Sequence, residues 1–569
     1  MDIQNLRWWG WGTLDQDYSL EGRPAFWPML REQLELPAEA IEHETPPIPL
    51  EEISLRPPRF GDPELSSLRK LLGEEAVRTD RLARAEHAYG QAYRDLLRIR
   101  AGHIPHPPDV VAYPADEAQI ASLLSWAADH DVAVIPFGGG SSVLGGVEPE
   151  PDDRPTITLD LARLDRMLAV DPVSRTARLQ AGATGPEVEA QLNARGFTLG
   201  HFPQSFEFST LGGWIATRSA GQNSIGYGKI EHMTQAVRTI TPAGIVETRD
   251  TPATAAGPSL LQLLVGSEGT YGVITEATMR IHPLPAVRDY RGILFHGLEN
   301  GVAAFRDLMQ SSRLHPAIIR LSDAPETAAS VALSHEHHGL RRLADKLVEW
   351  YLKTAGYDLT TGSTVMMLGF DGDTEWTAQQ WDLALEICGD HRGLSLGRSV
   401  GRSWIRDRYA QPYLRDTLLG HGIMVDTLET ATSWSNLTHL YETMVRAMKE
   451  SITATGGGPG YVMTHISHAY KHGASLYSTF LGRQVSDPDS LVRQAQWQAV
   501  KKATTDAIVA AGGTLTHHHG IGRDHAPWLE EEVGPLGVQM LDTIRQTLDP
   551  AGIMNPGILL PGKGDGGHD

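Results

Sequence analysis

A run of glycines directly after a strand-like segment constrains this chain more than any other feature. Four apolar residues that suit a buried strand, Val132 to Ile135, lead into Pro136-Phe137-Gly138-Gly139-Gly140-Ser141-Ser142, and Gly145 and Gly146 follow. Glycine has no Cβ, so another molecule can approach the main chain closely, and successive N–H groups form an anion site without basic side chains. This glycine loop (residues 136–146) contains no lysine or arginine. It matches neither the G-x-G-x-x-G nor the Walker pattern. It is either a flexible surface turn or a loop that holds a pyrophosphate through backbone dipoles.

Length and composition exclude several classes of protein. A chain of 569 residues is expected to form two or three domains. Its net charge of −21 argues against binding to nucleic acid and against broad attraction to anionic membranes. The single cysteine, Cys388, excludes an intrachain disulfide framework and fits a reducing compartment. No signal peptide and no membrane-spanning run is recognised, so a cytoplasmic enzyme is expected.

The pattern of short strands and helices predicts an α+β fold in four segments. Residues 1–100 form a helical arm, in which the tryptophans between Trp8 and Gly12 are expected to dock the arm on the body. Residues 101–285 form a domain of two subdomains that contains the glycine loop. Residues 286–500 form an α/β cap domain, and residues 501–569 a helical segment that returns to the body. Strands are predicted at 110–113, 156–160 and 176–181, and a hairpin at 237–248.

A second group of hydrogen-bond donors is predicted between Gly200 and Gly228. A short apolar helix is expected to begin at Leu211, with Ser209 and Thr210 as caps. The cap hydroxyls and the helix N-terminus would then face the same point, which suits a polar ligand. The segment Gly266 to Thr270, just before a predicted strand, adds further turn residues.

The densest chemical signal is the triplet His517-His518-His519. On a strand, His517 and His519 would share one side and His518 would face the other. His465 and His468 could contribute to a metal site, but their spacing is no metal signature, and no metal is predicted. Proton exchange suits the triplet better, since imidazole titrates near neutral pH. Tyr477, in an expected strand, is either a core residue or a base whose phenolate the histidines' positive charge would favour.

Two arginines lie among apolar residues and need an anionic partner. Arg320 and Arg415 would each face a protein carboxylate or a carboxylate or phosphate of the substrate, and the residues alone do not decide between these. The amphipathic stretch from Gly339 to Tyr357 is either an ordinary packed helix or a helix at a membrane surface.

The glycine loop, the Gly200–Gly228 stretch and Gly266 to Thr270 together resemble the FAD domain of the vanillyl-alcohol oxidase family. Within it, the chain resembles the alkyldihydroxyacetonephosphate synthases over most of its length. The matching motifs are Trp9 to Gly12, Glu207 to Trp214, Arg320, Arg415, Gly473-Ala474 with Tyr477, and His517 to Gly522. By this resemblance, the residues that contact FAD are Pro136, Gly138, Gly139, Gly140, Ser141, Ser142, Pro203, Ser205, Ser209, Thr210, Gly212, Gly213, Ser219, Ala220, Gly221, Tyr227, Gly228, Glu268, Gly272 and Ile274.

The resemblance implies an exchange of the acyl chain of an acyl-dihydroxyacetone phosphate for a long-chain fatty alcohol, a step of ether lipid synthesis. FAD would act there without net redox chemistry. Tyr477 would transfer protons, the three histidines would bind substrate and handle protons, and Arg320, Arg415 and Arg523 would hold anionic groups. His525 replaces a basic residue, which puts part of the phosphate site in question. No histidine lies in the glycine loop, so FAD is expected to be non-covalent.

The alternative is an FAD-linked D-2-hydroxyacid dehydrogenase or oxidase. Such enzymes carry Glu-His before Gly-Ile-Gly and a histidine-rich metal stretch, whereas this chain has His518-His519 and lacks the stretch. A flavin-binding protein without catalysis is a third possibility. A homodimer and a peripheral contact with membranes remain open.

Overall fold

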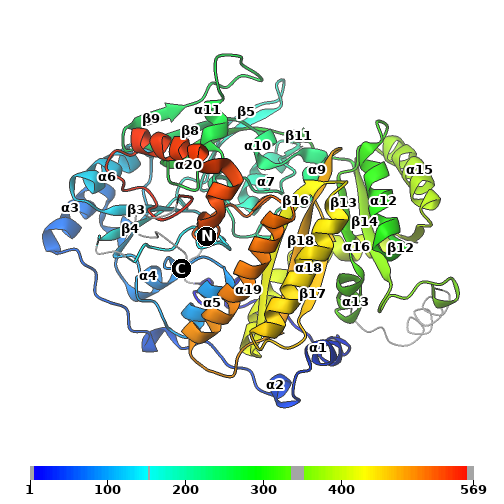
Figure 1. The fold of residues 1–569 in the computed structure, drawn as a ribbon. Coiled ribbons are helices and arrows are strands. Elements are labelled where there is room, and N and C mark those ends of the chain that lie inside the picture. Colours follow the sequence, from blue (N-terminus) through cyan, green and yellow to red (C-terminus); the bar gives the residue numbers. More distant parts are fainter. Residues whose placement is uncertain (1–4, 152–153, 335–351, 561–569) are drawn as a thin grey trace.

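The computed structural model describes residues 5–151, 154–334 and 352–560. They form a glycine-loop domain, on the left of Figure 1, and a cap domain on the right. The N-terminal arm and the C-terminal segment both pack on these two domains. The predicted α+β class, with a two-subdomain domain and a cap, is confirmed.

The first subdomain is a four-stranded sheet in the order β1-β2-β4-β3. Strands β2 (Val110–Ala112), β4 (Thr156–Asp160) and β3 (Ala133–Phe137) run parallel, and β1 (Val77–Arg78) is antiparallel to β2. Helix α6 (Glu117–Asp129) covers the sheet, and both faces are apolar, as is usual for parallel strands. The glycine loop therefore begins at the end of a buried strand, as predicted.

The second subdomain is an antiparallel sheet in the order β5-β6-β10-β8-β9. These strands are β5 (Met167–Asp171), β6 (Thr176–Gln180), β10 (Val273–Arg280), β8 (Thr234–Thr241) and β9 (Gly244–Glu247). Helices α7 (Gly185–Asn193) and α8 (Leu211–Ala216) pack on it. Helix α8 begins at Leu211, and the Thr210 hydroxyl accepts a hydrogen bond from Gly213 N at 3.4 Å, as the sequence predicted.

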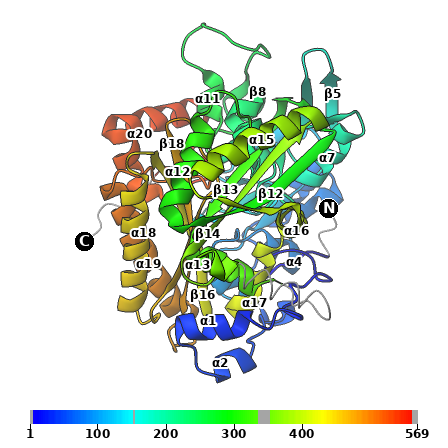
Figure 2. The same cartoon turned by 90° about the vertical axis from the view of Figure 1, so that its right-hand side faces the viewer.

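The cap domain is a seven-stranded antiparallel sheet in the order β15-β12-β14-β13-β17-β18-β16. Its strands are β12 (Val287–His296), β13 (Ile318–Ser322), β14 (Ser363–Gly372), β15 (Leu394–Gly397), β16 (Ile423–Ser433), β17 (Tyr461–Ile466) and β18 (Gly473–Arg483). Helices α12 (Gly297–Gln310), α15 (Thr374–Asp390), α18 (Leu437–Ala454) and α19 (Ser490–Ala510) share one core with the sheet, and α18 and α19 lie side by side (Figures 1 and 2). Successive side chains of a strand point to opposite faces of the sheet. Every second side chain of β13, β16, β17 and β18 therefore points to the face opposite these helices, and the cavity described below lies on that face.

The described parts of the N-terminal arm and of the C-terminal segment pack on the two domains. Helix α1 (Phe26–Leu34) packs against α17 (Gln411–Gly420) and the ends of β16 and β18, and α5 (Tyr93–Arg100) packs against α19. After α20 (Leu529–Leu548), the chain returns to β3, where Val134 N donates to Ile553 O at 2.8 Å and Asn555 N donates to Val134 O at 2.9 Å.

Two expectations from the sequence concern membranes. The amphipathic stretch 339–357 lies mostly outside the described residues, so its role is not decided. Among the residues that the structure describes, none of the helices combines the length and the apolar character needed to cross a bilayer.

Candidate active site

One cavity of about 420 Å³ is lined by residues of both domains. Its volume lies in the range usual for small-molecule and cofactor sites. The glycine loop, α8 and Glu268 form one part of its wall, and the free face of the cap sheet forms another. All the predicted FAD-contacting residues line it except Gly221, Tyr227 and Gly228.

The glycine loop is packed so closely that only glycine fits. A Cβ on Gly139 would lie 1.8 Å from the carbonyl oxygen of Phe208, and one on Gly138 would lie 2.2 Å from Thr210 Oγ1. The main chain of the loop therefore lies against the N-terminal end of α8, and main-chain N–H groups and small hydroxyls meet at one wall. A dinucleotide pyrophosphate fits this donor set, which contains no lysine or arginine. Gln222, which also lines the cavity, has a buried Oε1 with no hydrogen-bond partner among the described residues, so it can accept from a ligand.

The three predicted FAD-contacting residues that do not line the cavity have other roles. Gly221 packs against the backbone, since a Cβ there would lie 2.5 Å from Phe202 N. The Tyr227 hydroxyl donates to Asp371 Oδ2 of the cap at 2.7 Å, and Gly228 ends the short helix α9 (Ser224–Tyr227) with a φ of 93°. Of the three residues, Tyr227 thus joins the glycine-loop domain to the cap domain.

Tyr477 faces the cavity from β18, the strand next to the edge strand β16 of the cap sheet. It pairs with Glu429 of β16 on one side and with His465 of β17 on the other, so the three side chains share the cavity face. The Tyr477 ring stacks on His465 at 4.9 Å between centroids and lies 5.4 Å from the His519 ring. Burial raises the pKa of Tyr477 to about 12, although a hydrogen bond with Thr427 lowers it. Of the two alternatives left open by the sequence, Tyr477 faces the histidines, but its phenol is neutral near pH 7 and not the phenolate considered for that case.

The histidine triplet is not a strand, which corrects the sequence prediction. Residues 517–519 form bends around the buried carboxylate of Glu429. Its Oε1 accepts from the main-chain N–H of His517, His518 and His519, each at 3.0 Å, and from the Thr516 hydroxyl at 2.6 Å. Because these donors converge on one carboxylate, the chain curls. His518 and His519 both line the cavity as a result, rather than facing opposite ways.

The rings of His517 and His519 are uncharged near neutral pH, and the ring of His517 has a polar partner at each nitrogen. Burial lowers the pKa of His519 to about 3 and that of His517 well below its ordinary value. His517 Nδ1 lies 3.1 Å from His518 Nδ1, and His517 Nε2 lies 2.6 Å from the Tyr470 hydroxyl. Nitrogen atoms of His468, His517 and His518 come within 4.8 Å of one another, a spacing that could hold a metal. His468 Nδ1, however, lies 2.7 Å from the Ser224 hydroxyl. The absence of a metal stays a prediction.

The two predicted arginines line the cavity with different partners. Arg320 Nη2 donates to Glu326 Oε1 at 2.8 Å and lies 3.1 Å from His465 Nδ1, so a protein carboxylate compensates its charge. Arg415 donates instead to the main-chain oxygen of Gln91 at 2.6 Å and to its side-chain oxygen at 3.3 Å. No ion pair of Arg415 within 4.0 Å is found among the described residues. Its guanidinium is therefore the better candidate for a substrate anion.

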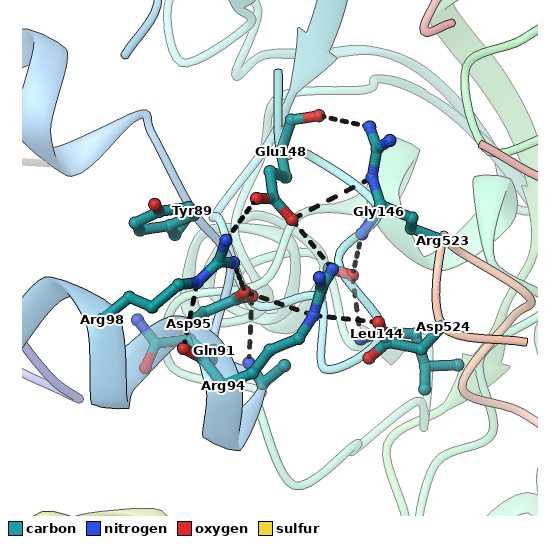
Figure 3. A network of polar contacts seen from close by, with 12 residues as sticks. Tyr89, Gln91, Arg94, Asp95, Arg98, Leu144, Gly146, Glu148, Arg523 and Asp524 are labelled. Atoms are coloured by element: carbon teal, nitrogen blue, oxygen red, sulfur yellow. Dashed lines mark hydrogen bonds and ion pairs between the residues drawn. The ribbon is translucent and has the colours of Figure 1, made fainter. Parts of the chain in front are cut away.

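Arg523 does not line the cavity, contrary to its predicted role in substrate binding. It belongs to a buried ionic network that also contains Arg94, Arg98, Glu148 and Asp524 (Figure 3). Glu148 contacts Arg94 at 2.8 Å and Arg98 at 2.7 Å, and these cations hold its pKa at about 2 against the effect of burial. The network joins α5, the glycine loop and the segment after the histidines. His525, also outside the cavity wall, is buried.

Several residues of this site were missed by sequence reasoning. Glu429 and Glu326 are acidic residues within apolar patterns, which is the one local signal that could have singled them out. Tyr470 and Gln222 carry no such signal. The apolar end of the cavity was also missed, and it is lined by Phe26, Met29, Leu30, Ala329, Leu333, Leu414, Leu418, Val425, Met463 and Leu481.

Comparisons with known proteins agree with this site. Residues 108–249 match the family model "FAD binding domain", and residues 284–559 match "FAD linked oxidases, C-terminal domain". The alkyldihydroxyacetonephosphate synthase of Dictyostelium discoideum is 34% identical over 98% of this chain and 94% of its own length, and that of Trypanosoma brucei brucei is 37% identical over 89% and 82%. A solved alkyldihydroxyacetonephosphate synthase structure superposes with a TM-score of 0.83 at 31% identity and covers 98% of both chains. FAD is thus confirmed as the cofactor, and the chain belongs to the alkyldihydroxyacetonephosphate synthase family.

Proposed function

We propose that this protein exchanges the acyl chain of an acyl-dihydroxyacetone phosphate for a long-chain fatty alcohol and releases alkyl-dihydroxyacetone phosphate and a fatty acid. The observation that carries the proposal is that one cavity joins three environments. These are the glycine-loop wall, the polar group around Tyr477 and Arg415, and an aliphatic end beneath α1. An amphiphilic lipid with a phosphate needs both a cationic and an aliphatic region, whereas a small 2-hydroxyacid has no use for the aliphatic one.

The role proposed for each residue follows from its surroundings. Arg415, whose guanidinium has no carboxylate partner within 4.0 Å among the described residues, would bind the phosphate. Tyr477, neutral near pH 7, would donate a hydrogen bond to the departing acyl oxygen, which leaves as a carboxylate. His518 and His519 would accept the proton of the incoming alcohol, since their rings line the same cavity. Arg320, held by Glu326 and His465, would position Tyr477 through the stacked His465 ring. Bound FAD would supply its reactive isoalloxazine ring, used without net electron transfer.

The test is to incubate the purified flavoprotein without oxygen or another electron acceptor, together with palmitoyl-dihydroxyacetone phosphate and hexadecanol. The expected result is ether product and free palmitate in equal amounts, with the flavin spectrum oxidised before and after. Acetyl-dihydroxyacetone phosphate with ethanol should react poorly, because neither fills the aliphatic end. Bleaching of the flavin by a D-2-hydroxyacid, without ether product, would overturn the proposal in favour of the dehydrogenase alternative.

The proposal also includes the cellular location of the enzyme and its contact with membranes. A lipid substrate favours transient contact with a membrane surface, and the buried free thiol of Cys388 is compatible with a cytoplasmic location. Cell fractionation would test both points.

A further inference from the structure

The proposed reaction requires that one proton leave the cavity in each turnover. The C–O bond to the acyl oxygen breaks and a C–O bond to the alcohol oxygen forms, and no electrons are transferred. The alcohol gives up its proton, and the fatty acid, an ordinary carboxylic acid, leaves as a carboxylate at neutral pH. The proton must therefore pass from a largely apolar cavity to water.

A chain of hydrogen bonds leads away from the cavity at the histidine triplet. His518 lines the cavity, and its Nδ1 lies 3.1 Å from His517 Nδ1. The other nitrogen of His517, Nε2, lies 2.6 Å from the hydroxyl of Tyr470. The two nitrogens of His517 thus face different partners, His518 and Tyr470, which is the arrangement that the middle member of a proton relay needs, because imidazole can accept a proton at one nitrogen while it releases one from the other. His517 itself does not line the cavity.

The surroundings of the chain suit a transient positive charge. The Glu429 carboxylate lies 3.4 Å from His518 Nδ1 and is buried, so it can stabilise a protonated ring for the time of transfer. Lys229 Nζ donates to the main-chain oxygen of His517 at 2.7 Å and pairs with Glu231 at 3.1 Å. His468 stacks on His517 at 5.2 Å between centroids, so the orientation of the middle ring is fixed on several sides.

The chain ends near water. Tyr470 lies in the turn between β17 and β18, where its N–H donates to Gly473 O at 2.8 Å. Its side chain is half-buried, and the next two residues, Lys471 and His472, are exposed. We propose that Tyr470 is the outer end of a proton relay, His518–His517–Tyr470, that carries the alcohol's proton from the cavity to solvent. Tyr470 acts through His517 and does not touch the substrate. This inference rests on the proposed function.

The experiment compares the wild type with Tyr470→Phe, which removes the hydroxyl and keeps the ring. Ether formation is measured in a weakly buffering medium and again with rising concentrations of imidazole. We expect the Tyr470→Phe rate to fall about tenfold or more in the weak buffer and to recover as imidazole carries the proton instead. The wild-type rate should not depend on the buffer. Tyr357→Phe, whose lost hydroxyl donates to Arg392 O at 2.9 Å outside the cavity wall, is the matched control and should behave as the wild type.

The experiment distinguishes a failure of the relay from a failure of the proposed function. A Tyr470→Phe rate equal to the wild type in every buffer, or a reduced rate that imidazole does not restore, would refute the relay. A wild type that forms no ether product would refute the proposed function instead. Tyr470→His, which restores a group able to transfer protons, should recover part of the lost rate if the relay is correct. Flavin content and melting temperature show that each variant is folded.

Discussion

The carboxylate of Glu429 should determine where His517, His518 and His519 lie, and Glu429→Gln tests this. Four donors converge on it, namely the hydroxyl of Thr516 and the main-chain N–H groups of the three histidines. A hydrogen bond to a charged group contributes about 1.5–3 kcal/mol and one to a neutral group about 0.5–1.5 kcal/mol. Neutralising the acceptor should therefore cost about 1 kcal/mol for each donor, or roughly 4 kcal/mol in all. In the wild type, Oε2 also accepts a hydrogen bond from His517 N at 2.7 Å. With the amide NH₂ in place of Oε2, two N–H donors would face each other.

Hydrogen exchange measures this loss at the segment itself. A loss of 4 kcal/mol corresponds to about 10³-fold faster exchange of the amides of residues 517–519, and turnover should fall by at least about 10²-fold while FAD stays bound. Glu532→Gln is the matched control. Glu532 accepts from Thr514 Oγ1 at 2.6 Å and from Leu515 N at 2.9 Å just before the triplet, but it is exposed. Exchange at 517–519 that changes less than about tenfold in Glu429→Gln would refute the reasoning.

Four further predictions follow from single contacts. Tyr477→Phe should keep its flavin while turnover falls by about 10²–10⁴-fold, and a nearly normal rate would remove the tyrosine from the mechanism. Gly139→Ala places a Cβ 1.8 Å from Phe208 O and should weaken FAD binding by about tenfold or more, seen as a lower 450 to 280 nm absorbance ratio, whereas Gly389→Ala, with open space around it, should bind FAD normally. Burial, aided by Asp160, raises the pKa of Glu86 to about 8, and neither carboxylate oxygen has a hydrogen-bond partner among the described residues. The folded protein thus holds a proton that the unfolded chain loses near pH 4.3, and stability declines as the pH rises toward 8. At about 1.4 kcal/mol for each pKa unit, Glu86→Gln should therefore gain on the order of 5 kcal/mol over the wild type at pH 9 and only about 1 kcal/mol at pH 5, and equal melting shifts at both pH values would contradict this. Finally, acid precipitation should leave FAD in the supernatant, because no covalent link is expected, and a yellow pellet would contradict that expectation.

The elements whose causes are local were predictable from the sequence. Three glycines after an apolar strand favour a tightly packed loop, and a threonine before a short apolar helix favours an N-cap, whatever lies around them. The strands at 156–160 and 176–180 and the helix that begins at Leu211 therefore lie where expected. The position of the glycine loop was predictable for the same reason, whereas only the resemblance to a family indicated that Tyr477 belongs to the site.

The features that depend on distant residues were not predictable. Glu429 bends the histidine triplet although it lies 88 to 90 positions away in the sequence. The residues near His517 give no sign that this carboxylate is its partner. The sequence also left the protonation of Tyr477 open, because it is decided by burial, a property of the whole fold, which raises the pKa of the phenol. Arg320 and Arg523 have acidic partners that only the tertiary structure reveals.

The contact between β3 and the last turn of the chain has a consequence for biosynthesis. Asn555 bonds to Val134, and its side-chain amide donates to Gly146 O at 3.0 Å and Glu268 O at 2.6 Å, so it fastens both sides of the flavin wall. A ribosome makes these residues more than four hundred positions after the glycine loop. The wall is therefore complete only after Asn555 has been synthesised and has reached β3, so the finished wall cannot hold the coenzyme before then. A chain that stops before Ile553 should accordingly emerge colourless, although every residue of the glycine loop is present.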